Sequence, residues 1–115
     1  MTDVFIAGIG QTPVGELWEI SLRDLAVQAA RRAIEDAGGL KPDLLYIGNM
    51  LAPQLSDQAH LGSLIADHAG LKGTEAAVLE AGGASGGAAL RLGYMAVTSG
   101  EVEAALVLGV ELVVA

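Results

Sequence analysis

One short segment of this 115-residue chain has residue types and a spacing that suit covalent catalysis. Residues 83–87, GASGG, match the pattern G-x-S-x-G, in which a serine nucleophile occupies a sharp turn between a strand and a helix. A serine hydrolase of that kind also needs an acid and a histidine after the serine, whereas His60 and His68 both precede Ser85. The favoured interpretation is a glycine-rich strand-to-helix turn with Ser85 in the first helical turn, and a hydrolase is the weaker alternative.

The other side chains capable of chemistry form no recognisable catalytic or metal-binding pattern. The chain has no cysteine, which excludes disulfides, thiolate metal sites and cysteine nucleophiles. His60 and His68 are eight residues apart on one predicted helix, and no metal site is expected from them. Glu80 and Glu111 stand at the ends of predicted strands, where solvated carboxylates are commoner than buried, hydrogen-bonded ones.

The glycines near the N-terminus do not form a nucleotide-binding loop. A dinucleotide fingerprint that starts at Gly8 needs a third glycine at position 13, which is Pro13. A phosphate loop over residues 10–15 needs a following lysine, and Glu16 stands there. Both motifs are therefore absent.

The composition indicates a folded domain without nucleic-acid or membrane partners. Fourteen acidic and six basic side chains give a net charge of −8, which opposes binding to a phosphate backbone. Hydrophobic residues make up 52% of the chain and charged residues 17%, unlike a disordered segment. The longest apolar run, residues 104–110, is far shorter than the roughly 20 residues that span a bilayer. No basic region precedes an apolar stretch as in a signal peptide, so we expect a cytoplasmic protein.

The hydrophobic pattern alternates between short apolar runs and longer helical segments. Such alternation predicts an α/β fold, βαβαβαβ, with a mostly parallel sheet and right-handed connections. The length suits one small domain or part of a larger one. We predict strands at 4–9, 44–47, 76–79 and 104–110, and helices at 21–37, 56–69 and 84–99. Ser21, with Asp24 three residues later, marks the start of the first helix, and Gly38 marks its end. Ser56 or Asp57 caps the second helix, whose core face is formed by Leu61, Leu64, Ile65 and His68.

The last predicted helix has no polar face. Between residues 84 and 97 the only charged side chain is Arg91. A helix that is apolar all round must be covered all round, so we expect this helix to be buried between two layers. Four strands cannot supply a second sheet, which indicates that the chain is incomplete on its own. The alternative is a helix that is merely rich in small residues.

Several stretches resemble, in order, the start of thiolases. They are VFIAGIGQTPVG, SLRDLAVQAARRAIEDAG, YIGNML, QAHLGSLIADHAGL and LEAGGASGGAALRLGYMAVTSGEVEAALVLGVE. The resemblance is to the archaeal and sterol-carrier-type branch of acetyl-CoA acetyltransferases. It implies a fold of two similar halves, each a five-stranded mixed sheet, with one helix of each half buried between the sheets. Residues 1–115 would then be a partial N-terminal half, without its last strand and without the whole C-terminal half.

The resemblance also implies a reaction and a position for its nucleophile. Thiolases form an acyl-thioester on a cysteine at the amino end of the buried helix, where the helix dipole favours a thiolate. That position corresponds to Gly83, which cannot carry an acyl group, although its backbone N–H would still be half of an oxyanion hole. Ser85 corresponds to a serine that is not the acyl carrier. The implied substrate is a coenzyme A thioester, with no covalently bound cofactor, and we expect this chain alone to be inactive in Claisen condensation or thiolysis of 3-oxoacyl-CoA.

Besides the acyltransferase, two other interpretations stay open, and one contact between copies of the chain is expected. Some thiolase-like proteins lack the nucleophilic cysteine and act as retro-aldolases or as non-catalytic partner subunits, and Gly83 fits those classes too. A non-enzymatic assembly domain is a third interpretation. In the family the strand before the nucleophile pairs with its two-fold mate, so we expect a homo-oligomer through residues 76–81.

Overall fold

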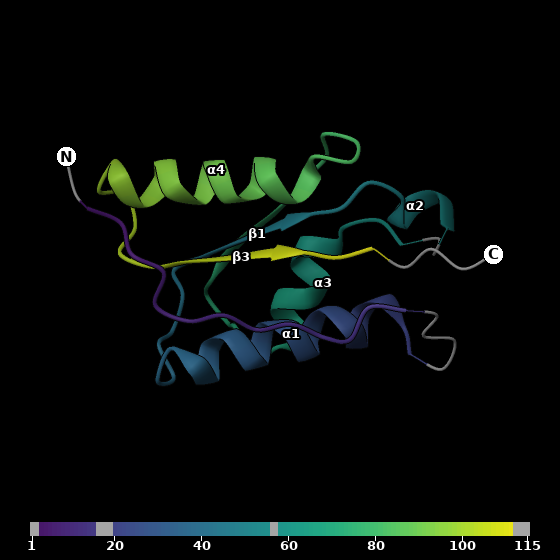
Figure 1. The fold of residues 1–115 in the computed structure, drawn as a ribbon, viewed down its shortest axis with the longest axis horizontal. Coiled ribbons are helices and arrows are strands. Elements are labelled where there is room, and N and C mark those ends of the chain that lie inside the picture. The colour runs from purple at the N-terminus through teal and green to yellow at the C-terminus, as the bar shows by residue number, and fades with distance from the viewer. Residues whose placement is uncertain (1–2, 16–19, 56–57, 112–115) are drawn as a thin grey trace.

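A parallel sheet of three strands organises the chain, as the computed structural model shows for residues 3–15, 20–55 and 58–111 (Figure 1). The strands alternate with helices, which confirms the predicted α/β fold. In chain order the elements are α1 (Leu22–Asp36), β1 (Leu44–Gly48), α2 (Ala52–Leu55), α3 (Leu61–His68), β2 (Glu75–Leu79), α4 (Ser85–Thr98) and β3 (Ala105–Gly109).

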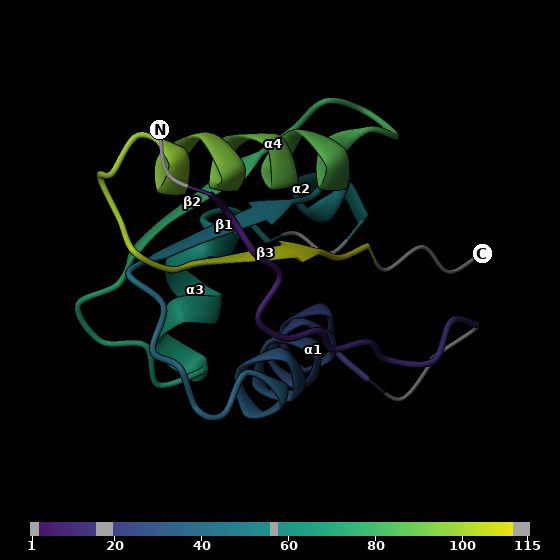
Figure 2. The ribbon, with the colours of Figure 1, turned by 60° about the vertical axis from the view of Figure 1, so that its left-hand side comes forward.

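The order of the strands places helices on both faces of the sheet. β1 lies in the centre, with β2 on one side and β3 on the other. The two crossovers therefore run in opposite directions, and right-handed connections put their helices on opposite faces. Accordingly α4 covers one face, while α3 and α1 lie on the other (Figures 1 and 2). Because Gly48 is in register with Leu79 and Gly109, all three strands end at one edge.

The main core lies between the sheet and the pair α1 and α3. The central strand reads LLYIG, an apolar run typical of a strand covered on both faces. Leu45 and Ile47 of β1 are completely buried and belong to one cluster with Leu61 and Ile65 of α3. Ala26 of α1 is also completely buried there, since small side chains let the helix approach closely.

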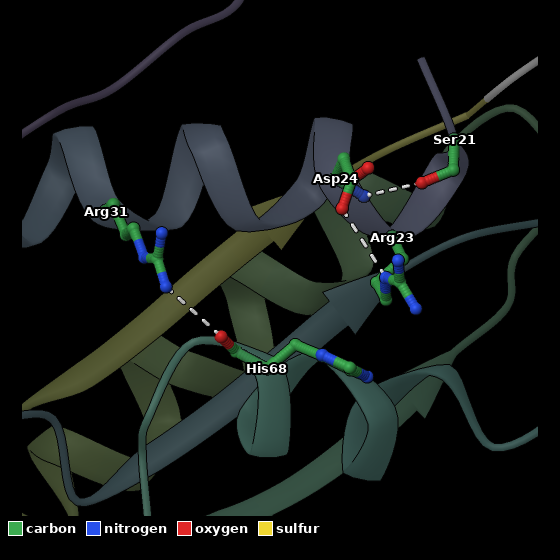
Figure 3. A network of polar contacts seen from close by, with 5 residues as sticks. All are labelled: Ser21, Arg23, Asp24, Arg31 and His68. Carbon is green, nitrogen blue, oxygen red and sulfur yellow. Dashed lines mark hydrogen bonds and ion pairs between the residues drawn. The ribbon is translucent and has the colours of Figure 1, made fainter.

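The first helix begins and ends as its sequence predicts. Ser21 Oγ accepts a hydrogen bond from the backbone N–H of Asp24 at 3.1 Å (Figure 3). After the helix, Gly38 takes the left-handed conformation, with φ of 76°. On the exposed side, the Arg31 guanidinium donates to the carbonyl oxygen of His68 at 3.3 Å and so ties α1 to the carboxyl end of α3 (Figure 3).

The prediction of a buried strand at residues 4–9 was wrong for this structure. The segment forms no strand, and Phe5 and Ile6 are 82% and 81% exposed. Instead the N-terminal part of the chain leads to α1 and then follows that helix (Figures 1 and 2), and Gly8 lies against the backbone of Ala33. The N–H of Ile9 donates to Asp36 Oδ2 at 2.9 Å. A helix side chain therefore binds a backbone group that a sheet would otherwise pair, while β1 pairs directly with β3.

The helix predicted at residues 56–69 corresponds to the shorter helix α3, and the short helix α2 lies before the predicted start. α2 comes first, and α3 begins only at Leu61, after His60 with a positive φ of 55°. The predicted caps at positions 56 and 57 lie outside the described residues. Leu61 and Ile65 are buried as expected, but His68 is exposed because it closes the helix, where its carbonyl faces Arg31.

The apolar helix α4 is covered on one side only. Ala89 is completely buried against the sheet, and Gly93 is buried beside it. On the opposite side Leu90, Tyr94 and Met95 are 57%, 53% and 47% exposed. The expectation of a helix buried all round is therefore not met within this chain, because the single sheet offers one surface. No helix in the described ranges is long and apolar enough to cross a membrane.

Gly93→Ala should destabilise the chain although alanine favours helices. A Cβ at this position would lie 2.6 Å from Cγ2 of Val107, whose branched side chain has little freedom to move. We expect a loss of about 1–3 kcal/mol in the free energy of unfolding, measured by urea denaturation. Gly87→Ala is the matched control, because nothing lies within 4 Å of its added Cβ. Equal stability of the two variants would contradict this packing.

Polar substitution of the exposed side of α4 should leave the fold intact. The triple variant L90Q/Y94Q/M95Q removes apolar side chains that this chain leaves largely in water. We expect a free energy of unfolding within about 1 kcal/mol of the original and weaker fluorescence of a bound hydrophobic dye. Ala89→Gln, on the buried side, should instead cost about 3 kcal/mol or more. Unfolding of the triple variant would mean that these side chains are already covered.

Candidate active site

A cavity opens where the strands end and α4 begins. It encloses about 240 Å³ at the carboxyl edge of β1 and β3, the usual place for ligands in open α/β sheets. Five of its lining residues are glycines, at positions 48, 82, 83, 86 and 109. Met50, Ser85, Val110 and Glu111 complete the lining.

The cavity exists because α4 starts almost in contact with the strand ends. A Cβ on Gly48 would collide with the carbonyl oxygen of Ser85. A Cβ on Gly109 would lie 3.7 Å from Cα of Gly86. Only a glycine at position 48 allows this approach, which brings the amino end of α4 and its free N–H groups to the sheet edge.

Hydrogen bonds within residues 80–85 hold the turn that enters α4. The Glu80 carboxylate accepts from the N–H of Gly82. Ser85 Oγ donates to the carbonyl oxygen of Gly82 at 2.6 Å and accepts from the N–H of Ala81 at 3.0 Å. Ser85 is buried, and both hydrogen bonds of its hydroxyl stay within the turn, so the hydroxyl stabilises the backbone. The hydrolase alternative loses its nucleophile, and neither histidine lines the cavity.

Gly83 lies at the rim of the cavity with open space beside it. The residue is exposed, and nothing lies within 4 Å of the place where a Cβ would stand. It directly precedes Ala84, the N-cap residue of α4. A side chain at this position would therefore displace no neighbour.

The opposite wall depends on Asn49, which no sequence pattern singles out. This side chain is 3% exposed and follows β1 directly. Its Nδ2 donates to the carbonyl oxygen of Val110 at 2.7 Å, and its Oδ1 accepts from the N–H of Ala52 at 2.9 Å. Its backbone N–H donates to the carbonyl oxygen of Leu79 at 3.1 Å. One residue thus joins the ends of all three strands.

Glu111 adds a second connection across the same edge. Its carboxylate accepts from the N–H of Met50, and also from the N–H of Leu51 at 3.4 Å. Solvated carboxylates are the expectation from the sequence for Glu80 and Glu111. Both residues are exposed, yet each accepts a backbone hydrogen bond. The position of Glu80 and Glu111 at the ends of predicted strands was the available signal for these roles.

The histidines do not form a site. His60 and His68 are exposed at opposite ends of α3. Within residues 3–15, 20–55 and 58–111, no group of three or more histidine, aspartate or glutamate side chains is placed to hold a metal ion.

Comparisons with known proteins agree with this architecture. Residues 4–114 match the family described as the N-terminal domain of thiolase. An acetyl-CoA acetyltransferase of Methanothermobacter thermautotrophicus is 50% identical over 113 residues, which are 96% of this chain and 30% of that protein. One of Methanocaldococcus jannaschii is 49% identical over 96% of this chain and 29% of its own length. The chain thus spans less than a third of these curated relatives.

Two solved structures share the fold. An acetyl-CoA acetyltransferase of Syntrophomonas wolfei superposes with a TM-score of 0.75 at 23% identity, over 84% of this chain and 26% of that one. A 3-oxoacyl-[acyl-carrier-protein] synthase III of Aquifex aeolicus gives a TM-score of 0.64 at 26% identity, over 73% and 27%. The match over residues 4–114 and the two relatives at about half identity show that this chain belongs to the thiolase family, as an N-terminal domain.

Proposed function

We propose that this chain is the N-terminal part of a thiolase-type acyl-CoA acyltransferase, an acetyl-CoA C-acetyltransferase. The reaction is Claisen condensation of two acyl thioesters, or its reverse, the thiolysis of a 3-oxoacyl-CoA. The observation that carries the proposal is the position of Gly83 at the rim of a cavity beside the amino end of α4. There a thiolate would meet the helix dipole, and backbone N–H groups would receive the developing oxyanion.

In this proposal the chain supplies the acyl-binding edge but not the nucleophile. Gly83 has no side chain to accept an acyl group, so the first half of the reaction, transfer of acyl from coenzyme A to the enzyme, is blocked. The backbone N–H of Gly83 remains as an oxyanion donor. A coenzyme A thioester is then bound rather than acylating the protein, and the chain alone is inactive in condensation and thiolysis.

The exposed side of α4 supports the view that the active protein has a further layer. Leu90, Tyr94 and Met95 form an apolar strip that is largely open to water in this chain. The chain spans only 30% and 29% of its two curated relatives, so most of their length lies outside the matched part. We infer that residues 1–115 are a partial N-terminal domain and that a second thiolase half covers this strip.

The absence of a nucleophile also favours a second candidate. A thiolase-like protein without the cysteine would cleave or form a carbon–carbon bond as a retro-aldolase on an acyl-CoA side chain, or would serve as a non-catalytic partner subunit. Glycine at position 83 suits both classes. The residues that follow this region in the gene discriminate between them, because histidine and cysteine motifs there belong to the acyltransferase.

Restoring a nucleophile should restore acylation. We would join the chain to the remaining part of the M. thermautotrophicus relative and compare this chimera with its Gly83→Cys variant. The cysteine variant should form an acetyl-enzyme with acetyl-CoA, seen by mass spectrometry, and should gain roughly a thousandfold or more in acetoacetyl-CoA thiolysis.

Gly87→Cys is the matched control for this experiment, since position 87 is also exposed, open and near the amino end of α4. This variant should stay unacylated because position 87 does not line the cavity. A folded Gly83→Cys chimera that takes no acetyl group would refute the proposal. Thiolysis by the unsubstituted chimera would refute the claim that the nucleophile belongs at position 83 and is missing there.

The edge of the sheet should mediate self-association. Among the described residues β2 pairs with β1 on one side only, and Val78 on it is 41% exposed. An uncovered edge strand pairs readily with a second copy, so we place a homo-oligomer contact at residues 76–81. Val78→Lys should lower the sedimentation coefficient of the chain to that of a monomer, whereas Val14→Lys, at a 93% exposed position, should not. A monomer before substitution would rule out this contact.

A further inference from the structure

We propose that Met50 limits the size of the acyl group that the cavity accepts, and that the Glu111 carboxylate holds Met50 in place for this task. This inference rests on the proposed function, because it assumes an acyl group attached at position 83. It goes further in assigning a specificity-determining residue and a positioning residue.

Few of the side chains that line the cavity could limit the size of a ligand. Five lining residues are glycines, and the Ser85 hydroxyl is bound within the turn. Val110 is 8% exposed and belongs to the core cluster on the α1 side of the sheet. Met50 and Glu111 are the lining residues with long side chains, and the Glu111 carboxylate is bound to backbone N–H groups. The thioether side chain of Met50 therefore forms the adjustable wall.

Hydrogen bonds to Glu111 and Asn49 hold the backbone at and after Met50. Three successive backbone N–H groups are bound by side-chain oxygens: those of Met50 and Leu51 by Glu111, and that of Ala52 by Asn49. Asn49 is itself bound to the carbonyl oxygen of Val110 at 2.7 Å. Residues 49–52 and 110–111 thus form one connected unit, and loss of the Glu111 carboxylate frees the backbone that carries Met50.

The volume of the cavity and the position of Met50 limit the length of the acyl group. A short acyl chain on position 83 fits within about 240 Å³ lined mostly by glycine backbone. A longer chain meets Met50, whose flexible thioether yields gradually rather than forming a rigid stop. The cavity therefore accepts short acyl groups more readily than long ones.

The test uses two thiol-reactive reagents whose alkyl groups differ in length, so that it does not depend on acyl transfer. In the Gly83→Cys variant, methyl and hexyl methanethiosulfonates react with the introduced thiolate to give a mixed disulfide and release methanesulfinate. The ratio of hexyl to methyl labelling rates, followed by mass spectrometry, reports the space available beyond position 83. Met50→Ala should raise this ratio about fivefold or more, because an alkyl chain then fits where Met50 stood.

The positioning role of Glu111 is tested by substitutions of Glu111 with and without the Met50 side chain. Glu111→Ala should also raise the ratio, and Glu111→Gln, which keeps one acceptor oxygen, should lie between. The double variant M50A/E111A should not exceed M50A, since Glu111 acts only by holding Met50. Met95→Ala and Glu101→Gln are the matched controls, because both residues are exposed and neither lines the cavity.

The two proposals fail in different ways. An unchanged ratio in M50A, an equal rise in M95A, or a double variant above M50A overturns the inference even if the Gly83→Cys chimera is acylated. Conversely, a Gly83→Cys chimera that accepts no acetyl group refutes the proposed function, while the reagent ratio still decides the role of Met50.

Discussion

The close approach of α4 to the ends of the central strands is the contact that makes the cavity possible. The carbonyl oxygen of Ser85 lies where a Cβ on Gly48 would have to stand, and Gly93 packs on Val107 farther along the helix. Glycine at these places lets the helix lie close to the sheet, with backbone against backbone at Gly48 and helix backbone against a valine side chain at Gly93. As a result the amino end of α4 reaches the sheet edge, and the cavity lies between them.

The same edge is held by polar side chains rather than by packing. Asn49 joins the three strand ends, and Glu111 binds the loop that follows β1. A buried amide is stable only when its donors and acceptors are paired, and Asn49 has a partner for both its Nδ2 and its Oδ1. An acyl-transfer site needs rigid backbone at its rim, because an oxyanion donor works only at a defined distance from the reacting carbonyl.

The two faces of the sheet differ in how completely they are covered. On one face α1 and α3 enclose a core in which Leu45, Ile47 and Ile65 are completely buried. On the other face α4 lies alone, with an apolar strip outward. This asymmetry explains why α1 has a polar exposed side, with Arg31 and Arg32, while α4 has almost no polar side chains.

Elements whose signals are local could be predicted from the residues alone. The cap at Ser21, the left-handed Gly38, the three strands and the start of α4 all depend on neighbouring residues, and the structure contains each of them. The apolar character of α4 and the glycine at position 83 are also evident from the sequence. The contact of residues 4–9 with α1 could not be predicted, because an apolar run carries no information about its partner. Nor could the unit formed by Asn49, Met50 and Glu111, since residues about 60 positions apart meet only after the parallel strands align in register.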